Sequence, residues 1–350
     1  MKLEIISRNG EEVRVRVEAD AQEMDKAFTD GLDAFVVQNN LDSLAGETSM
    51  EKLQNALSED EAKQAIYTAV MNYLVPFAIS EFGQAPLATY GIESDETPET
   101  GKPYTFEMTI LEKPHYELTD YEPLTVIIDP KPSVQEEDID QQLQMLASQM
   151  VASQQNIDPN SPEVELPEIT DEWVAQNLKD SDIHTVSELR QRLHATSEEE
   201  LATRYEQAKM AAAMEAYRDR FTGTVSKKML DAMTQELYET FLAELASEGM
   251  TFEDFAGQHD FTEDTVRASL SKQAENQLIQ GFILDAIFDH EALVLEPSDL
   301  IAVMRNIAPG REEETLEAMR KSGRSFLLRQ SAARMKAANW IMQNTTFVSE

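Results

Sequence analysis

Apolar and polar residues alternate along residues 3–5 and 13–17, which is the period-2 pattern of a strand with one buried face. Asn9-Gly10 lies between the two runs and suits a type I′ hairpin turn, because both residue types tolerate positive φ. The alternation returns over residues 104–111 and stops before Pro114, which lacks a backbone donor. The pattern predicts an N-terminal hairpin and a later strand at which the chain leaves the sheet.

Helical spacing of apolar residues begins directly after the hairpin and runs from residue 21 to about 40. Two capping boxes follow, Thr48 to Glu51 and Ser58 to Glu61, and each precedes a further apolar periodic segment. Together with the strands, these helices predict a small α+β domain over residues 1–112.

The rest of the chain is mainly helical in pattern. A short alternating run at 124–128 predicts a second, separate strand, and residues 134–152 predict a helix. A concentration of prolines between 153 and 170 then predicts a linker. We assign residues 113–165 to a tether, a helix and a proline-rich linker, and residues 166–350 to a helical domain that bears arms. The predicted fold class is α+β.

The charge of the chain is strongly negative, since 66 acidic and 29 basic residues give a net charge of −37. Nucleic acid and anionic membrane surfaces are therefore poor partners. There is no cysteine, which excludes a disulfide framework, a thiolate nucleophile and a zinc ribbon. The first residues lack the apolar core of a signal peptide, and no run approaches the roughly 20 apolar residues of a membrane helix. We expect a cytoplasmic protein; only the missing signal argues against the periplasm.

The charge is unevenly distributed. Residues 301–350 hold eight basic and five acidic residues, a net charge of +3, so the other 300 residues carry −40. This local excess fits a solvated helix face, or attraction to an acidic partner or to an acidic part of the same chain.

Residues with catalytic or metal-binding patterns are missing from the sequence. None of the motifs of serine hydrolases, zinc proteases, dinucleotide-binding domains or phosphate-binding loops occurs. The histidines are scattered, and a surface or capping role is favoured over metal binding for each: His115, His184, His194, His259 and His290. Pairs of carboxylates are no evidence for a general acid and base, because 66 acidic residues make such pairs common by chance. We predict no catalytic residue, no metal site and no cofactor.

Methionine is frequent, with sixteen residues, several of them on helical stripes. Its unbranched side chain repacks readily around different apolar partners. Two stripes stand out, one of Met210, Met214, Tyr217 and Phe221 and one of Met229, Met233, Leu237 and Phe241. Each stripe either fills a core or binds apolar partners, and spacing alone does not separate the two interpretations.

The stretch from 101 to 146 closely resembles the domain junction of the bacterial trigger factor chaperones. In that family a strand ending in proline is followed by a tether of spaced leucine and tyrosine residues, and then by a short strand and an acidic-capped helix. Residues 104–114, 118–124 and 134–139 occupy those steps here. The resemblance resumes at "ELPEITDEWVAQNL" (165–178) and covers nearly the whole chain. Its specificity lies in the ordered series of segments.

Two departures from the family pattern matter. Between Met150 and Glu165 the family usually inserts a prolyl isomerase domain of roughly a hundred residues, whereas about fifteen residues stand there in this chain. The family's basic ribosome-docking loop also has no counterpart, because residues 32–51 contain no basic residue and Lys52 lies past the turn. We therefore expect no isomerase activity, and ribosome docking is doubtful.

The resemblance implies an ATP-independent chaperone that binds unfolded or nascent polypeptide through apolar helical surfaces and acts in protein folding and transport. The eight stripe residues are then the candidate client-binding residues. The alternative is a dedicated assembly or scaffold protein for one partner, in which internal packing would consume both stripes. A third function, prolyl isomerase activity, is implied only by the name of the family.

Overall fold

The computed structural model describes residues 1–155, 158, 166–179, 181–259 and 261–349. Of the predicted proline-rich linker, Pro159 and Pro162 lie outside the described residues. The chain divides into two compact units, residues 1–121 with 217–340 and residues 122–216 with 341–350. Each unit buries an apolar core of its own.

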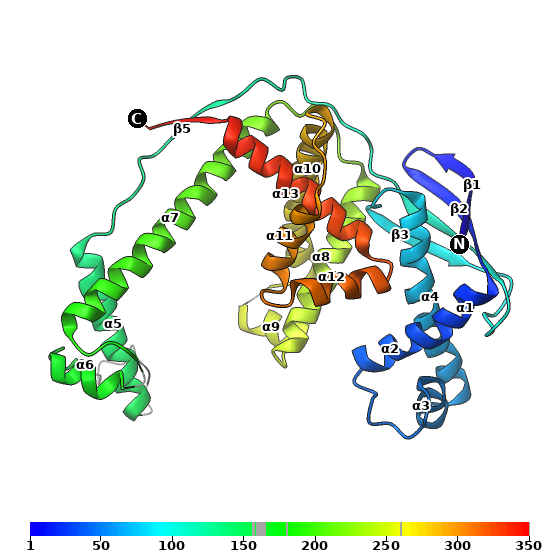
Figure 1. Ribbon diagram of the computed structural model, residues 1–350, viewed down its shortest axis with the longest axis horizontal. Helices are drawn as coiled ribbons and strands as arrows, with labels where there is room; N and C mark the ends of the chain where they lie inside the picture. The colour runs from blue at the N-terminus through cyan, green and yellow to red at the C-terminus, as the bar shows by residue number, and fades with distance from the viewer. Residues whose placement is uncertain (156–157, 159–165, 180, 260, 350) are drawn as a thin grey trace. The chain divides into compact units, whose positions relative to one another are not determined.

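The first unit contains a sheet, the helices packed on it and a second group of helices (Figure 1). Its elements are β1 (Lys2–Asn9), β2 (Glu12–Ala19), α1 (Ala21–Lys26), the π-helical turn η1 (Ala27–Gly31), α2 (Leu32–Gln38), α3 (Ser49–Ala56), α4 (Glu59–Phe82), β3 (Ala88–Glu93), β4 (Tyr104–Leu111), α8 (Lys227–Ser247), α9 (Phe252–His259), α10 (Glu263–His290), α11 (Pro297–Ile307), α12 (Glu312–Lys321) and most of α13 (Ser325–Asn344).

The sheet is antiparallel, with strand order β1-β2-β4-β3. Gly10 in the β1–β2 turn has a φ of +62°, which glycine adopts without strain, so the predicted hairpin is confirmed. β2 and β4 pair with Val15 opposite Met108 and Val17 opposite Phe106. The alternating apolar residues of both strands therefore share one face of the sheet.

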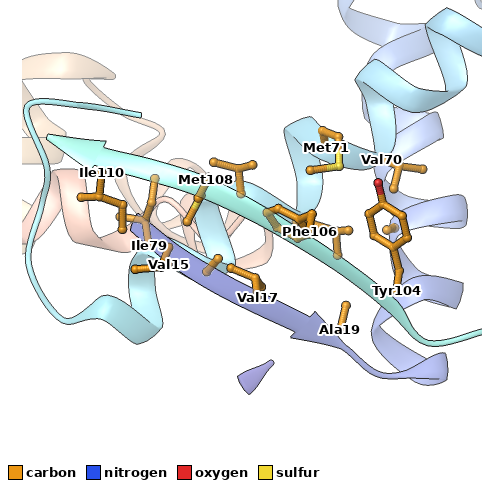
Figure 2. Close-up of a cluster of buried hydrophobic side chains, with 14 of the residues drawn as sticks. Val15, Val17, Ala19, Val70, Met71, Ile79, Tyr104, Phe106, Met108 and Ile110 are labelled. Carbon is orange, nitrogen blue, oxygen red and sulfur yellow. The ribbon is translucent and has the colours of Figure 1, made fainter. Parts of the chain in front are cut away.

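Helix α4 covers that apolar face (Figure 2). Val15, Phe106 and Met108 are at most 1% exposed and belong to one cluster with Val70 and Met71 of α4. Full burial of side chains of this size contributes about 1.5–3 kcal/mol each. A one-residue slip of a strand would turn its apolar set to solvent, so this core also fixes the register.

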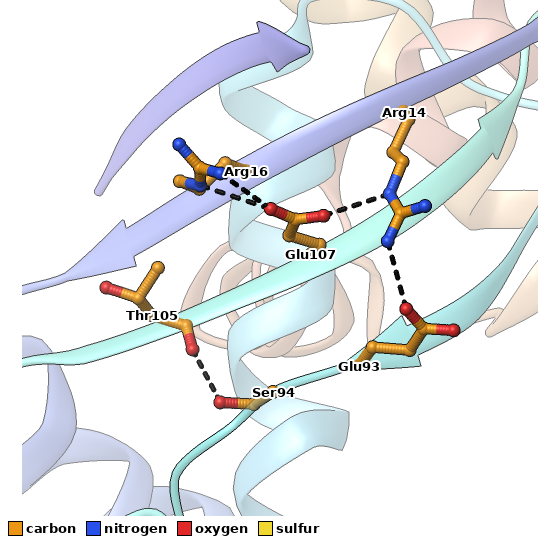
Figure 3. A network of polar contacts seen from close by, with 6 residues as sticks. All are labelled: Arg14, Arg16, Glu93, Ser94, Thr105 and Glu107. Carbon is orange, nitrogen blue, oxygen red and sulfur yellow. Dashed lines mark hydrogen bonds and ion pairs between the residues drawn. The ribbon is translucent and has the colours of Figure 1, made fainter. Parts of the chain in front are cut away.

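The opposite face of the sheet carries charged residues (Figure 3). Arg14 donates to Glu107 and to Glu93 at 2.9 Å each, and Arg16 donates to Glu107 at 2.8 Å. The hydrogen bond from Arg16 is the main reason why the pKa of Glu107 is lowered. The arginines are nearly half exposed, so these pairs contribute little to stability and mark the solvent face.

Several contacts join the sheet region to the second group of helices within the first unit, among them an apolar cluster and a hydrogen bond. Leu111 at the end of β4 is buried in a cluster with Met229 of α8 and Phe282 of α10. At the α12–α13 turn, the Gly323 carbonyl accepts a 3.0 Å hydrogen bond from the Ser80 hydroxyl of α4. The strand at which the sheet ends thus supplies part of the helical core.

The second unit contains β5 (Thr125–Ile128), α5 (Glu136–Gln155), α6 (Asp171–Asn177), most of α7 (Val186–Arg218) and β6 (Thr346–Ser349). Its core joins Ile139 and Leu143 of α5 to Val174 of α6 and Leu189 of α7. β5 and β6 pair in parallel, so the last strand of the chain lies against the predicted short strand at 124–128.

The predicted α+β class is confirmed, because the N-terminal region carries the four-stranded sheet and the remainder is mainly helical. Within the described part of the chain, no helix is both long and apolar enough to cross a membrane.

Candidate functional site

The first predicted stripe does not remain on one helix. Met210 is half-buried and Met214 is buried on α7, while Tyr217 is 1% exposed near its end. Phe221 lies beyond the helix, in an isolated bridge to Leu118. Its ring packs against those of Tyr116 and Phe282, so Phe221 contributes to a core of the first unit.

The second stripe runs along α8 from a core to a more exposed end. Met229 is fully buried, and Met233 packs against the same cluster. Leu237 and Phe241, further along the helix, are half-buried. The four residues therefore share one helix face. Met229 and Met233 are packed in a core, whereas Leu237 and Phe241 remain partly accessible.

The end of this stripe leads into a cluster of aromatic rings, which we call the aromatic tip: Tyr238, Phe241, Phe252, Phe255 and Phe261. The ring centroids of Phe241 and Phe255 are 5.2 Å apart in an edge-on arrangement, and those of Phe255 and Phe261 are 5.9 Å apart and stacked. Phe261 is 48% exposed, and Phe241, Phe252 and Phe255 are half-buried. The tip thus combines mutual ring packing with accessible apolar surface.

The aromatic tip lies where the chain reverses between α8 and α10, with α9 inside the reversal (Figure 1). The start of α9 is capped by Thr251, whose hydroxyl donates to the Asp254 carboxylate at 2.7 Å, while the Asp254 N–H donates back at 3.2 Å. This hydroxyl is the main reason why the pKa of Asp254 is lowered. The cap fixes the beginning of the short helix that carries Phe252 and Phe255.

Charge around the aromatic tip is almost entirely negative. Residues 235–267 contain nine acidic residues and one basic residue, Arg267. The Arg267 guanidinium carbon lies 3.7 Å from the centre of the Tyr238 ring and its Nε donates to Glu263 at 2.7 Å. The single cation is therefore occupied by the protein's own groups, and the surroundings favour a neutral or basic ligand.

Sequence reasoning found Phe241 but missed Tyr238, Phe252, Phe255 and Phe261. A signal was present, because "FEDFAGQHDF" places three phenylalanines within ten residues between two helices. No group of three or more metal-ligating side chains occurs among the residues that the structure describes.

Comparison with known proteins assigns the family. Residues 1–146 match the family described as "Bacterial trigger factor protein (TF)", and residues 185–343 match the one described as "Bacterial trigger factor protein (TF) C-terminus". The chain belongs to the bacterial trigger factor family. The predicted resemblance is confirmed, and both matched ranges include parts of the first unit.

Individual trigger factors are distant relatives of this chain. A trigger factor of Geobacter sulfurreducens is 26% identical over 43% of this chain and 33% of its own length. A trigger factor of Agathobacter rectalis is 22% identical over 51% of this chain and 40% of its own length. A trigger factor of Shouchella clausii is 27% identical over 39% of this chain and 31% of its own length. The matched stretches thus span between 31% and 40% of each of these trigger factors.

One of the solved structures that align with the chain covers almost all of it. It is described as "Promiscuous Substrate Recognition in Folding and Assembly Activities of the Trigger Factor Chaperone" and matches 98% of this chain and 99% of its own at 12% identity, with a TM-score of 0.38.

Proposed function

We propose that this trigger factor relative is an ATP-independent chaperone that binds unfolded or nascent polypeptide in the cytoplasm and assists its folding. Family membership supports a chaperone role. The observation that carries the proposal further is the aromatic tip, where phenylalanine rings stay partly accessible at the reversal between α8 and α10.

Affinity at the aromatic tip would be modest. A phenylalanine side chain buries about 150–250 Å² in full, so the exposed 48% of Phe261 offers about 100 Å² to a client. At about 25 cal/mol per Å² this ring contributes about 2.5 kcal/mol before ordering costs are subtracted. Several such contacts give weak, reversible binding, which allows release without an energy source.

The acidic surroundings would select among clients. Nine carboxylates and one arginine within residues 235–267 repel acidic segments and attract basic ones. They also keep the apolar rings of neighbouring molecules apart, so the loaded chaperone stays soluble.

An aggregation assay tests the proposal. Equimolar protein should suppress light scattering by several unrelated denatured clients of neutral or basic charge. The double variant Phe255→Ser and Phe261→Ser should lose most of this suppression with unchanged circular dichroism. Val294→Ser is the matched control, because Val294 is 71% exposed in the α10–α11 loop outside the tip. Absence of suppression by the unmodified protein would refute the proposal.

The second candidate is a dedicated assembly or scaffold protein for one partner. The burial of Met229 and Tyr217 favours it, since internal packing consumes these parts of both stripes. This function predicts stable capture of a single partner and no protection of unrelated clients, so the same assay distinguishes the two.

A further inference from the structure

A pocket of about 380 Å³ lies within the first unit, toward the C-terminal end of α10, whereas the aromatic tip adjoins the N-terminal end of that helix. Its lining comes from the 83–85 loop after α4, from residues 113–116 after β4, and from α10 and α13. Pockets for small ligands span roughly 300–1,000 Å³, so this one has room for a compact group.

Aromatic rings form much of the pocket wall: Tyr116, Phe282, Phe288 and Phe326. The Tyr116 ring lies 4.8 Å from that of Phe282, and its hydroxyl donates to the Thr224 carbonyl at 2.6 Å. Because this hydroxyl is already paired, Tyr116 adds apolar ring surface and no free polar group. The wall therefore suits an apolar ligand group.

Two lining residues, Asp285 and Lys113, belong to a charged network that Arg334, outside the lining, completes. Asp285 of α10 accepts hydrogen bonds at 2.9 Å from both Nε and Nη2 of Arg334 in α13, and at 3.0 Å from Lys113 Nζ. The three side chains are at most 27% exposed. Burial lowers the pKa of Lys113, and Arg334 adds to this effect although Asp285 opposes it. Two cations thus share one carboxylate.

The lining holds one further cation, Arg329, and one further carboxylate, Asp289. Arg329 of α13 is exposed, and among the described residues no carboxylate pairs with it. With its amide oxygen turned to the cations, Gln330 accepts from Lys113 at 3.3 Å and adds no charge. Asp289, the other acid in the lining, lies 3.6 Å from His115. The lining therefore holds two cations and two carboxylates, and Arg334, outside the lining, adds a third cation bonded to Asp285, in a chain whose net charge is −37.

We propose that this pocket binds a carboxylate carried by an apolar group, with the carboxylate on Arg329 and Lys113 and the apolar group against the rings of Phe288 and Phe326. A guanidinium and a carboxylate form paired, charge-assisted hydrogen bonds, and the neighbouring rings offer apolar contact to the rest of the ligand. The carboxylate comes either from the C-terminus of a polypeptide or from a small free acid. This binding is independent of clients at the aromatic tip.

Calorimetric titration of the full chain tests the proposal with four probes. They are 3-phenylpropionate, its amide, and an acetylated tetrapeptide ending in phenylalanine with either a free or an amidated C-terminus. Each carboxylate should bind at least about tenfold more tightly than its amide, a difference of about 1.4 kcal/mol. Tighter binding of the free-ended peptide would identify a polypeptide C-terminus, and equal or tighter binding of phenylpropionate a small free acid.

Two variants locate the site. Arg329→Gln should weaken carboxylate binding about tenfold, and Gln84→Trp, at an exposed position of the lining, should block the pocket. Arg311→Gln, an exposed arginine at the start of α12 and outside the lining, is the matched control. Equal affinity for acid and amide, equal loss in the control, or no saturable binding at millimolar concentration would overturn the proposal.

Discussion

Substitution of Asp285 by asparagine tests whether the shared carboxylate stabilises the first unit. This side chain accepts three hydrogen bonds from two cations that belong to different segments, Arg334 of α13 and Lys113 after β4. Asparagine has nearly the same volume but no charge, and its amide nitrogen would face donors. The variant therefore leaves two cations close together with no counter-charge between them.

The expected loss follows from burial. Removal of one partner from a fully buried ion pair costs about 3–5 kcal/mol. Asp285 and Arg334 each remain 27% exposed, and Lys113 15%, so water offsets part of the loss. We expect Asp285→Asn to lower the free energy of unfolding of the first unit by about 2–4 kcal/mol.

Urea unfolding followed by tryptophan fluorescence measures this loss, since Trp340 lies on the same helix as Arg334. Asp289→Asn is the control, one turn along α10, because its side chain is 58% exposed and faces only His115 at 3.6 Å among the ion pairs described. The control should stay within about 0.5 kcal/mol of the unmodified protein. A loss no larger for Asp285→Asn than for the control would refute the reasoning.

The effect should also depend on pH. Burial alone would raise the pKa of Asp285, but the hydrogen bonds and charge of Arg334, joined by Lys113, outweigh it and lower the pKa. A lowered pKa gives stability that is complete above the ordinary aspartate pKa of about 3.9 and is lost as pH falls through the folded-state value. The difference in free energy of unfolding between the unmodified protein and Asp285→Asn should therefore become smaller at acidic pH.

Four further outcomes are expected. Gly281→Ala should destabilise the protein by about 1–3 kcal/mol in urea unfolding despite the better helix propensity of alanine, because the added methyl would lie 2.6 Å from the Arg334 guanidinium. Met233→Glu should lower the melting temperature, whereas Phe241→Glu should mainly weaken client binding in the aggregation assay. A protease-coupled peptide assay should show only uncatalysed prolyl isomerisation, since the segment between α5 and α6 is too short to build a catalytic pocket; catalysis would contradict the domain assignment. Sedimentation through a sucrose cushion at low salt should leave the protein off ribosomes, because residues 32–51 hold only acidic charges; stoichiometric co-pelleting would show that another surface docks.

β2 and most of β4 were predictable from sequence because their burial alternates with a period of two, whereas β1 departs from the predicted alternation, since Ile5 is 45% exposed beside a register shift. Val13, Val15 and Val17 are each fully buried, and the residues between them are exposed, as alternation predicts. The turn at Asn9-Gly10 needs only local chemistry. Where the local pattern of apolar residues agrees with burial in the folded protein, a single sequence is enough to predict the secondary structure.

Exposure along the helices was not predictable in the same way. Met229 and Phe241 occupy the same stripe of α8, but Met229 is buried under Leu278 and Phe282 of α10 and Phe241 is half-buried among the tip rings. Helical spacing predicts which face of a helix is apolar. It does not predict which part of that face a neighbouring helix covers. The position at which α8 and α10 stop covering each other depends on where the chain reverses.

The aromatic tip follows from that reversal. Phe252 and Phe255 lie in a helix of eight residues, and Phe261 lies in the loop after it. The segment is therefore too short for a periodic pattern to predict these residues. Their rings lie 5.2–6.5 Å from those of α8 or of each other, and this contact removes part of the apolar surface from water. A fully covered cluster would bind nothing, and a fully open one would drive self-association. Under the proposed chaperone function, partial packing surrounded by carboxylates that repel a second acidic copy would meet both requirements, and transient contact with unfolded chains would then be expected rather than stable assembly.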